Sequence, residues 1–143
     1  MTTLWALPTI EITELTGVRE SRPAAVLTGE RSWGAVSPLL DLPIVVQAEP
    51  NRVDLDYMED LAAGLPPQAE VVYAVGGGLV ADVAKYVGHV RGLPVVLIPT
   101  ALSVDGFFTP IVAARSAGSV HYVETGPASK AIIDWSVIRN APV

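Results

Sequence analysis

The sequence predicts an α/β fold in which a doubly wound, mostly parallel sheet has helices on both faces. Four apolar runs, at residues 23–28, 43–47, 71–75 and 94–99, do not alternate between apolar and polar residues. Continuous runs of this kind are typical of strands buried on both faces, as in a parallel sheet covered by helices. Helical patterns lie between these runs, and that order of elements is typical of doubly wound domains. A weaker strand pattern lies at residues 9–12.

Two helices are predicted between the apolar runs. Residues 53–64 carry apolar side chains at helical spacing and end at Gly64, with Pro66 and Pro67 beyond, which is a normal helix ending. Residues 79–90 form the clearest amphipathic pattern in the chain. Its apolar positions follow the i, i+3, i+4, i+7, i+10 spacing and are Val80, Val83, Ala84, Val87 and Val90.

The pattern weakens after residue 99. Residues 100–110 are interpreted as a loop or a loop-to-helix junction. Residues 111–114 and 120–123 predict a β-hairpin excursion that turns around Ala117 and Gly118. Residues 131–133 predict a last short strand.

Composition favours one globular domain over residues 1–143. Half of the residues are hydrophobic and 17% are charged, which argues against disorder. Nine basic and fifteen acidic residues give a net charge of −6 without a basic stripe, so neither nucleic acid nor a membrane is expected as a partner. No cysteine is present, which excludes disulfides, iron–sulfur clusters and a cysteine nucleophile. With no signal-peptide pattern and no apolar stretch near the roughly 20 residues of a membrane span, a cytoplasmic protein is expected.

Three consecutive glycines carry the strongest chemical signal. Gly76, Gly77 and Gly78 lie between a predicted strand and a predicted helix, and Gly76, Gly78 and Ala81 match the G-x-G-x-x-G/A spacing of Rossmann-like domains. Glycine permits positive φ and a close approach by a ligand, and the free amides at a helix start bind phosphate. This context favours a phosphate site, the alternative being a tight turn that packs the helix on the sheet without a ligand.

Asp82 and Lys85 lie one helical turn apart in the same predicted helix. Taken alone, they are interpreted as a surface ion pair of little energetic weight, with Asp82 also favourable to the helix dipole.

The glycine run and the residues that follow it resemble those of a known family. The glycine run with Asp82, Ala84 and Lys85, followed by residues 94–100, is similar to the superfamily of iron-dependent alcohol dehydrogenases, glycerol dehydrogenases and dehydroquinate synthases. The run Pro-Thr-Ala-Leu-Ser-Val-Asp-Gly-Phe at residues 99–107 most resembles the glycerol-1-phosphate dehydrogenase family, and residues 130–142 resemble the end of that family's first domain.

The resemblance implies a nucleotide cofactor, NAD or NADP, and a role for each matching residue. Gly76, Gly77 and Gly78 would hold the cofactor pyrophosphate, and Asp82 would support its nicotinamide side. Thr100 and Ser103 would line the adenine and ribose pocket, and Asp105 would bind the polyol substrate. Without the resemblance, Thr100 and Ser103 would be interpreted as loop caps and Asp105 as part of a turn.

The sequence also departs from that family. Relatives hold zinc or iron through an aspartate and two histidines that lie largely in a helical second domain, and this sequence reaches only Val143. We therefore expect neither the metal-binding domain nor a metal nor catalytic residues in this chain. His89 and His121 match no family ligand and are interpreted as ordinary surface or packing residues.

Two further departures concern the cofactor. The hairpin reads Gly118-Ser119 where relatives usually have a lysine after the glycine, so one cofactor contact is missing. Relatives often carry an acidic residue after the first strand, which favours NAD, but Gly29, Glu30 and Arg31 stand there. The choice between NAD and NADP stays open.

Three functions are compatible with these observations. The leading one is the NAD(P)-binding domain of a glycerol-1-phosphate dehydrogenase-like oxidoreductase, which would show no turnover on its own. The second is a dehydroquinate synthase-like cyclase domain, whose Val-Asp-Ser-Ser motif starts at Val104-Asp105 but is broken at Gly106-Phe107-Phe108. The third is a non-catalytic binding module that forms a homo-oligomer or pairs with a separate metal-binding domain, or a truncated fragment of a longer protein.

Overall fold

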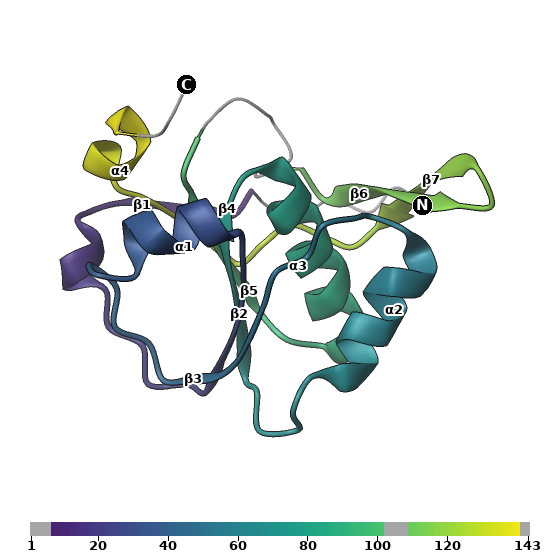
Figure 1. Ribbon diagram of the computed structural model, residues 1–143, viewed down its shortest axis with the longest axis horizontal. Coiled ribbons are helices and arrows are strands. Elements are labelled where there is room, and N and C mark those ends of the chain that lie inside the picture. The colour runs from purple at the N-terminus through teal and green to yellow at the C-terminus, as the bar shows by residue number, and fades with distance from the viewer. Residues whose placement is uncertain (1–6, 102–108, 141–143) are drawn as a thin grey trace.

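The computed structural model describes residues 7–101 and 109–140 and contains a six-stranded, fully parallel sheet (Figure 1). The strands follow the order β1-β8-β5-β4-β2-β3 across the sheet. Their bounds are β1 Thr9–Ile12, β2 Ala24–Thr28, β3 Ile44–Ala48, β4 Val71–Gly76, β5 Val95–Pro99 and β8 Lys130–Ile133. The doubly wound α/β fold and all six predicted strands are therefore confirmed.

Helices cover both faces of the sheet. Helices α2 (Leu55–Gly64) and α3 (Gly78–Arg91) pack on one face, and α1 (Glu30–Val36), the short 3₁₀ helix η1 (Leu15–Gly17) and α4 (Trp135–Arg139) pack on the other (Figure 1). The β2 side chains alternate between the two cores, so the whole strand is buried. This explains why its sequence is apolar throughout. In the described ranges no helix is long and apolar enough to cross a membrane.

The predicted hairpin is present as β6 (Ile111–Ser116) and β7 (Ser119–Glu124), paired antiparallel. Its turn residues have positive φ, 51° at Ala117 and 77° at Gly118, as a tight two-residue hairpin turn requires. Val112 and Ala114 are buried and face the domain, and α3 and α2 lie beneath β6. The hairpin thus extends the domain beyond the sheet without joining it.

The expectation that all four apolar runs are buried on both faces is wrong for β3. This strand is the edge of the sheet, and Ile44 and Val45 are 40% and 41% exposed. Only Val46 and Ala48 of this strand reach a core, as partly buried residues. An apolar run identifies a strand but not its place in the sheet.

Helices α1 and α4 were not predicted, because both are too short to show a helical period. Helix α4 nevertheless begins with a recognisable cap: the Asp134 carboxylate accepts hydrogen bonds from the Ser136 backbone N–H at 2.9 Å and the Ser136 hydroxyl at 2.6 Å. Its other oxygen accepts from the backbone N–H of Leu15 at 3.0 Å, 119 residues earlier in the chain. One buried carboxylate thus joins η1 to α4.

We expect Asp134→Ala to lower the free energy of unfolding by about 2 kcal/mol, because it removes a helix cap and leaves the buried Leu15 amide without its acceptor. Thermal or urea unfolding measures the change. Asp54→Ala is the matched control, since Asp54 precedes α2 without making a side-chain cap bond and is 44% exposed beside Arg52. Equal losses in the two variants would contradict the assigned role of Asp134.

A second polar cluster, partly buried, lies where β4 packs beside the chain that precedes β2. The Tyr73 hydroxyl donates to Glu20 Oε1 at 2.8 Å, and the Arg22 guanidinium donates to both Glu20 oxygens at 2.8 and 2.9 Å. The hydrogen bonds from Arg22, opposed by burial and helped by Tyr73, lower the pKa of Glu20 from 4.5 to about 2. Burial, followed by the bond to Glu20, raises the pKa of Tyr73.

This cluster predicts a pH-dependent stability. Because the folded pKa of Glu20 lies below its ordinary value, its contribution is complete above pH 4.5 and is lost as the pH falls towards 2. We expect Glu20→Gln to lower the free energy of unfolding by about 1 kcal/mol at pH 7 and by less at pH 3. The loss is small because Arg22 is partly exposed, and water weakens its ion pair with Glu20. A loss of stability that is the same at both pH values would refute this assignment.

Candidate nucleotide-binding site

The glycine turn joins β4 to α3, as the sequence predicts. Gly76 has φ +150°, and a Cβ there would lie 3.4 Å from both Ser32 Oγ and Val80 Cγ2. Gly77 is the residue before α3, has extended backbone angles of −96° and −162°, and faces no atom within 4 Å of an ideal Cβ. Gly78 is the first residue of α3. Gly76 is therefore required by the turn itself, whereas Gly77 leaves open space in front of a helix start.

The turn lies where the chain changes faces. Strands β2 and β4 are neighbours, but α1 follows β2 on one face of the sheet and α3 follows β4 on the other. Thr28 ties the two strand ends together, because its hydroxyl donates to the Val75 carbonyl at 2.8 Å. In open α/β sheets, ligands bind at such a switch point, outside the carboxyl ends of the strands.

Thr100 lies beside this turn. Its backbone N–H donates to the Gly76 carbonyl at 3.1 Å, and its hydroxyl lies 3.3 Å from Ser32 Oγ on α1. The structure therefore brings Thr100 together with Gly76, the first residue of the glycine turn. The other two predicted residues of the following segment, Ser103 and Asp105, lie outside the described residues.

A cleft of about 340 Å³ opens at this edge of the sheet, between α1, the end of β5 and α4. Its lining residues are Arg31, Ser32, Ala35, Leu39, Thr100, Ala101, Ser136, Val137 and Asn140. Of these, only Thr100 is a binding residue predicted from the sequence. The α1 and α4 residues were missed because no local motif marks them and the fold alone brings them together.

Asp82 and Lys85 form the predicted pair, with Asp82 Oδ1 and Lys85 Nζ 3.6 Å apart, but the pair is not on the surface. The Lys85 side chain is 1% exposed, and its ammonium group also donates to the backbone carbonyls of Thr109 and Ile111 at 3.1 Å each. The interpretation as a weak surface pair was therefore wrong for Lys85. This lysine fixes α3 to the chain that enters β6, at the end of the segment carrying Ser103 and Asp105.

Comparison with known proteins identifies the family. Residues 23–142 match the family model described as iron-containing alcohol dehydrogenase. The chain belongs to the iron-containing alcohol dehydrogenase family. It is similar to the glycerol-1-phosphate dehydrogenase [NAD(P)+] of Hyperthermus butylicus, with 33% identity over 118 residues, 82% of this chain and 33% of the relative. The corresponding enzyme of Thermofilum pendens is 42% identical over 76 residues, which are 52% of this chain and 22% of the relative.

Solved structures share the fold. A probable glycerol dehydrogenase from Sinorhizobium meliloti 1021 superposes with a TM-score of 0.82 at 20% identity, covering 99% of this chain and 43% of that one. A sulfoacetaldehyde reductase from Bifidobacterium kashiwanohense, solved in complex with NAD+, gives 0.78 at 16% identity, covering 99% and 48%. The chain thus spans less than half the length of these relatives.

The metal that the family name implies has no matching donor set in the described part of this chain. Residues 7–101 and 109–140 contain no group of three or more His, Asp or Glu side chains that could hold a metal ion. His89 on α3 and His121 on β7 are both exposed and lie on different elements. Since a catalytic metal needs three or more protein ligands, no step is assigned to one here.

Proposed function

We propose that this chain is the nicotinamide-nucleotide-binding domain of a glycerol-1-phosphate dehydrogenase-like oxidoreductase, with residues 1–143 forming one such domain. The observation that carries the proposal is the open space at Gly77, in front of the α3 N-terminus and at the switch point of the sheet. A pyrophosphate placed there meets the first backbone amides and the positive end of a fourteen-residue helix.

The neighbouring elements offer a place for the rest of the nucleotide. The cleft between α1 and α4 begins at Thr100, which is bonded to Gly76, so an adenosine in the cleft is continuous with a pyrophosphate at Gly77. On the other side of the turn, Asp82 lies one turn into α3 and is 26% exposed, which leaves its carboxylate accessible to the nicotinamide half. These positions support the roles proposed for Thr100 and Asp82.

In this arrangement the cofactor and the protein have different tasks in the reaction. A bound nicotinamide cofactor supplies hydride transfer, and this chain's part is to hold and orient it. Polyol-phosphate oxidation also needs groups that bind the substrate oxygen. Asp105 is proposed for part of that task on the strength of the sequence alone, since it lies outside the described residues.

Titration of the purified chain with NADH and NADPH tests the proposal. Nucleotide fluorescence and quenching of Trp33 and Trp135 follow binding, since both residues lie on the helices that border the cleft. We expect saturable binding of at least one nucleotide at micromolar to submillimolar concentrations. Absence of saturation for both up to millimolar concentration, with an intact circular dichroism spectrum, would refute the proposed function.

A further inference from the structure

One face of the β6–β7 hairpin is uncovered. Val112 and Ala114 of β6 are buried and face the domain. The alternate residues of β6, and the residues that pair with them on β7, point the other way. All of these are exposed, and together they form a surface that we call the outer hairpin face: Ile111, Ala113, Arg115, Val120, Tyr122 and Glu124.

The outer hairpin face has an apolar centre. Tyr122 lies opposite Ala113 in the middle of the face and is 74% exposed. Ile111 and Val120, on either side of this pair, are 42% and 48% exposed. Single exposed apolar residues are normal on a protein surface, whereas neighbouring ones that form a patch mark an interaction site.

The hairpin is fixed to the domain, so this face has a defined shape. Lys85 Nζ donates to the Ile111 carbonyl at 3.1 Å, at the start of β6. Near the turn, the Arg115 backbone N–H donates to the Val53 carbonyl at 2.9 Å. A preformed surface of this kind loses little conformational freedom when it binds a partner.

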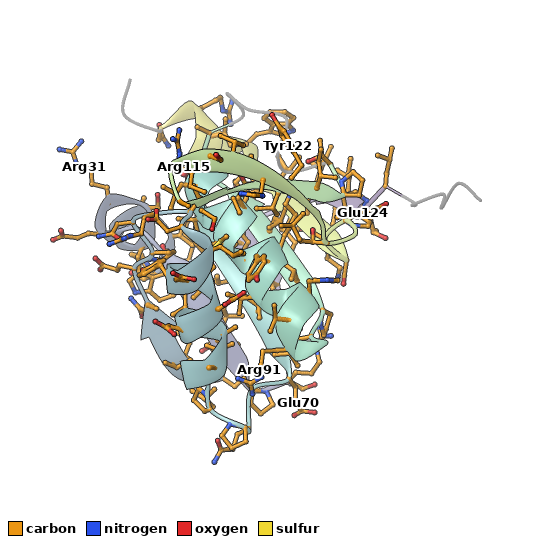
Figure 2. The ribbon with its side chains drawn as sticks, turned by 90° about the vertical axis from the view of Figure 1, so that its right-hand side faces the viewer. Arg31, Glu70, Arg91, Arg115, Tyr122 and Glu124 are labelled. Carbon is orange, nitrogen blue, oxygen red and sulfur yellow. The ribbon has the colours of Figure 1, made fainter. Side chains whose placement is uncertain are left out.

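Opposite charges lie at the two ends of the face. Arg115 pairs with Val120 near the turn, and Glu124 pairs with Ile111 at the base of the hairpin. The two charged residues are therefore four residues apart along the strands, which is about 13 Å. Figure 2 shows Tyr122 between Arg115 and Glu124.

We propose that the outer hairpin face binds a second copy of this chain in a two-fold symmetric dimer. A half-turn about an axis in the plane of the face, perpendicular to the line from Arg115 to Glu124, exchanges these two positions. Arg115 of each copy then meets Glu124 of the partner subunit, so the ion pair forms twice, as in every isologous contact. Tyr122 lies near the axis, where the rings of the two copies bury each other. The proposal does not depend on nucleotide binding.

Sedimentation velocity of the wild-type chain over a range of concentrations measures this association. We expect a monomer–dimer equilibrium with a dissociation constant of roughly 10–100 µM, because two hairpin faces bury less than the about 1,200 Å² of a stable complex. Tyr122→Ser should weaken the dimer at least about 10-fold, since it removes the large side chain at the centre. A chain that stays monomeric up to about 1 mM would overturn the proposal.

Charge reversal tests the pairing itself. Arg115→Glu and Glu124→Arg each place like charges together twice, so each should weaken the dimer at least about 10-fold. An equimolar mixture of the two variants should form a heterodimer, because their charges are complementary. The double variant R115E/E124R should dimerise like the wild type. A single variant that dimerises at wild-type strength, or a mixture that stays monomeric, would overturn the proposal.

Glu70→Arg is the matched control for Glu124→Arg. It makes the same change in net charge at an exposed position, at the far end of the domain from Tyr122 (Figure 2). This variant should dimerise like the wild type, and all variants should keep the wild-type circular dichroism spectrum. An equal loss of dimer in Glu70→Arg and Glu124→Arg would show that net charge controls the association, and would contradict the proposed pairing.

Discussion

Gly77→Val is expected to weaken nicotinamide nucleotide binding more than about 100-fold, because it blocks several amide–phosphate hydrogen bonds of about 1.5–3 kcal/mol each. The fold should survive the change. Gly77 has extended backbone angles that valine adopts readily, and its Cβ would meet no atom within 4 Å. The added side chain would instead fill the space in front of α3, where the phosphate is proposed to bind. Fluorescence titration with NADH and NADPH measures the effect.

Gly64→Val is the control for Gly77→Val. Gly64 ends α2 and also has open space around an ideal Cβ. It lies on the chain that leads into β4, whereas the glycine turn follows β4. This variant should bind nucleotide like the wild type. Both variants should keep the wild-type circular dichroism spectrum. Wild-type affinity in a folded Gly77→Val variant would show that the glycine turn is structural and that phosphate binds elsewhere.

Gly88→Ala is expected to cost about 3 kcal/mol of stability and about 10 °C in melting temperature, because it overfills a close contact between helix and strand. Its Cβ would lie 2.3 Å from Val95 Cγ2 and 2.9 Å from the Leu93 carbonyl oxygen. The side chain of Val95 has little room to move, since that residue is 5% exposed, and the carbonyl belongs to the backbone. The higher helix propensity of alanine, worth about 1 kcal/mol, does not compensate.

Gly34→Ala in α1 provides the comparison for Gly88→Ala. No atom lies within 4 Å of its ideal Cβ, so the alanine should leave stability unchanged or raise it. Below its melting temperature, Gly88→Ala should still bind nucleotide, the opposite of Gly77→Val. A Gly88→Ala variant as stable as the wild type would contradict the close packing of α3 on β5.

The elements that could be predicted from the sequence are those in which one pattern, an apolar run or a helical spacing, continues over many neighbouring residues. Strands β2, β4 and β5 are buried on both faces and so carry largely apolar runs, and the 14 residues of α3 give nearly four turns in which an amphipathic pattern can repeat. The edge position of β3 was not predictable, because its sequence is as apolar as that of the central strands. Helix α1 was missed because seven residues with a glycine inside show no period.

The candidate site also has features that could be predicted from the sequence and features that could not. The glycine turn was predictable because strand, turn and helix are contiguous in the chain. The burial of Lys85 was not, since its partners Thr109 and Ile111 lie 24 and 26 residues away. Arg31 reaches the cleft only because β2 and β5 end at the same edge, on either side of β4, which places Ser32 against Thr100 across 68 residues of sequence. Contacts of this kind follow from strand order, which no local pattern reveals.

We propose that a nicotinamide nucleotide binds at the carboxyl edge of this sheet, with its pyrophosphate at Gly77. Amide chemical-shift mapping of the isotope-labelled chain during titration with NADPH tests this most directly. We expect saturable shifts at Gly77 and Gly78, with further shifts at Ser32 and Thr100. Shifts confined to the opposite end of α3, around Gly92, or no saturable shift at the glycine turn, would show that the nucleotide does not bind at Gly77.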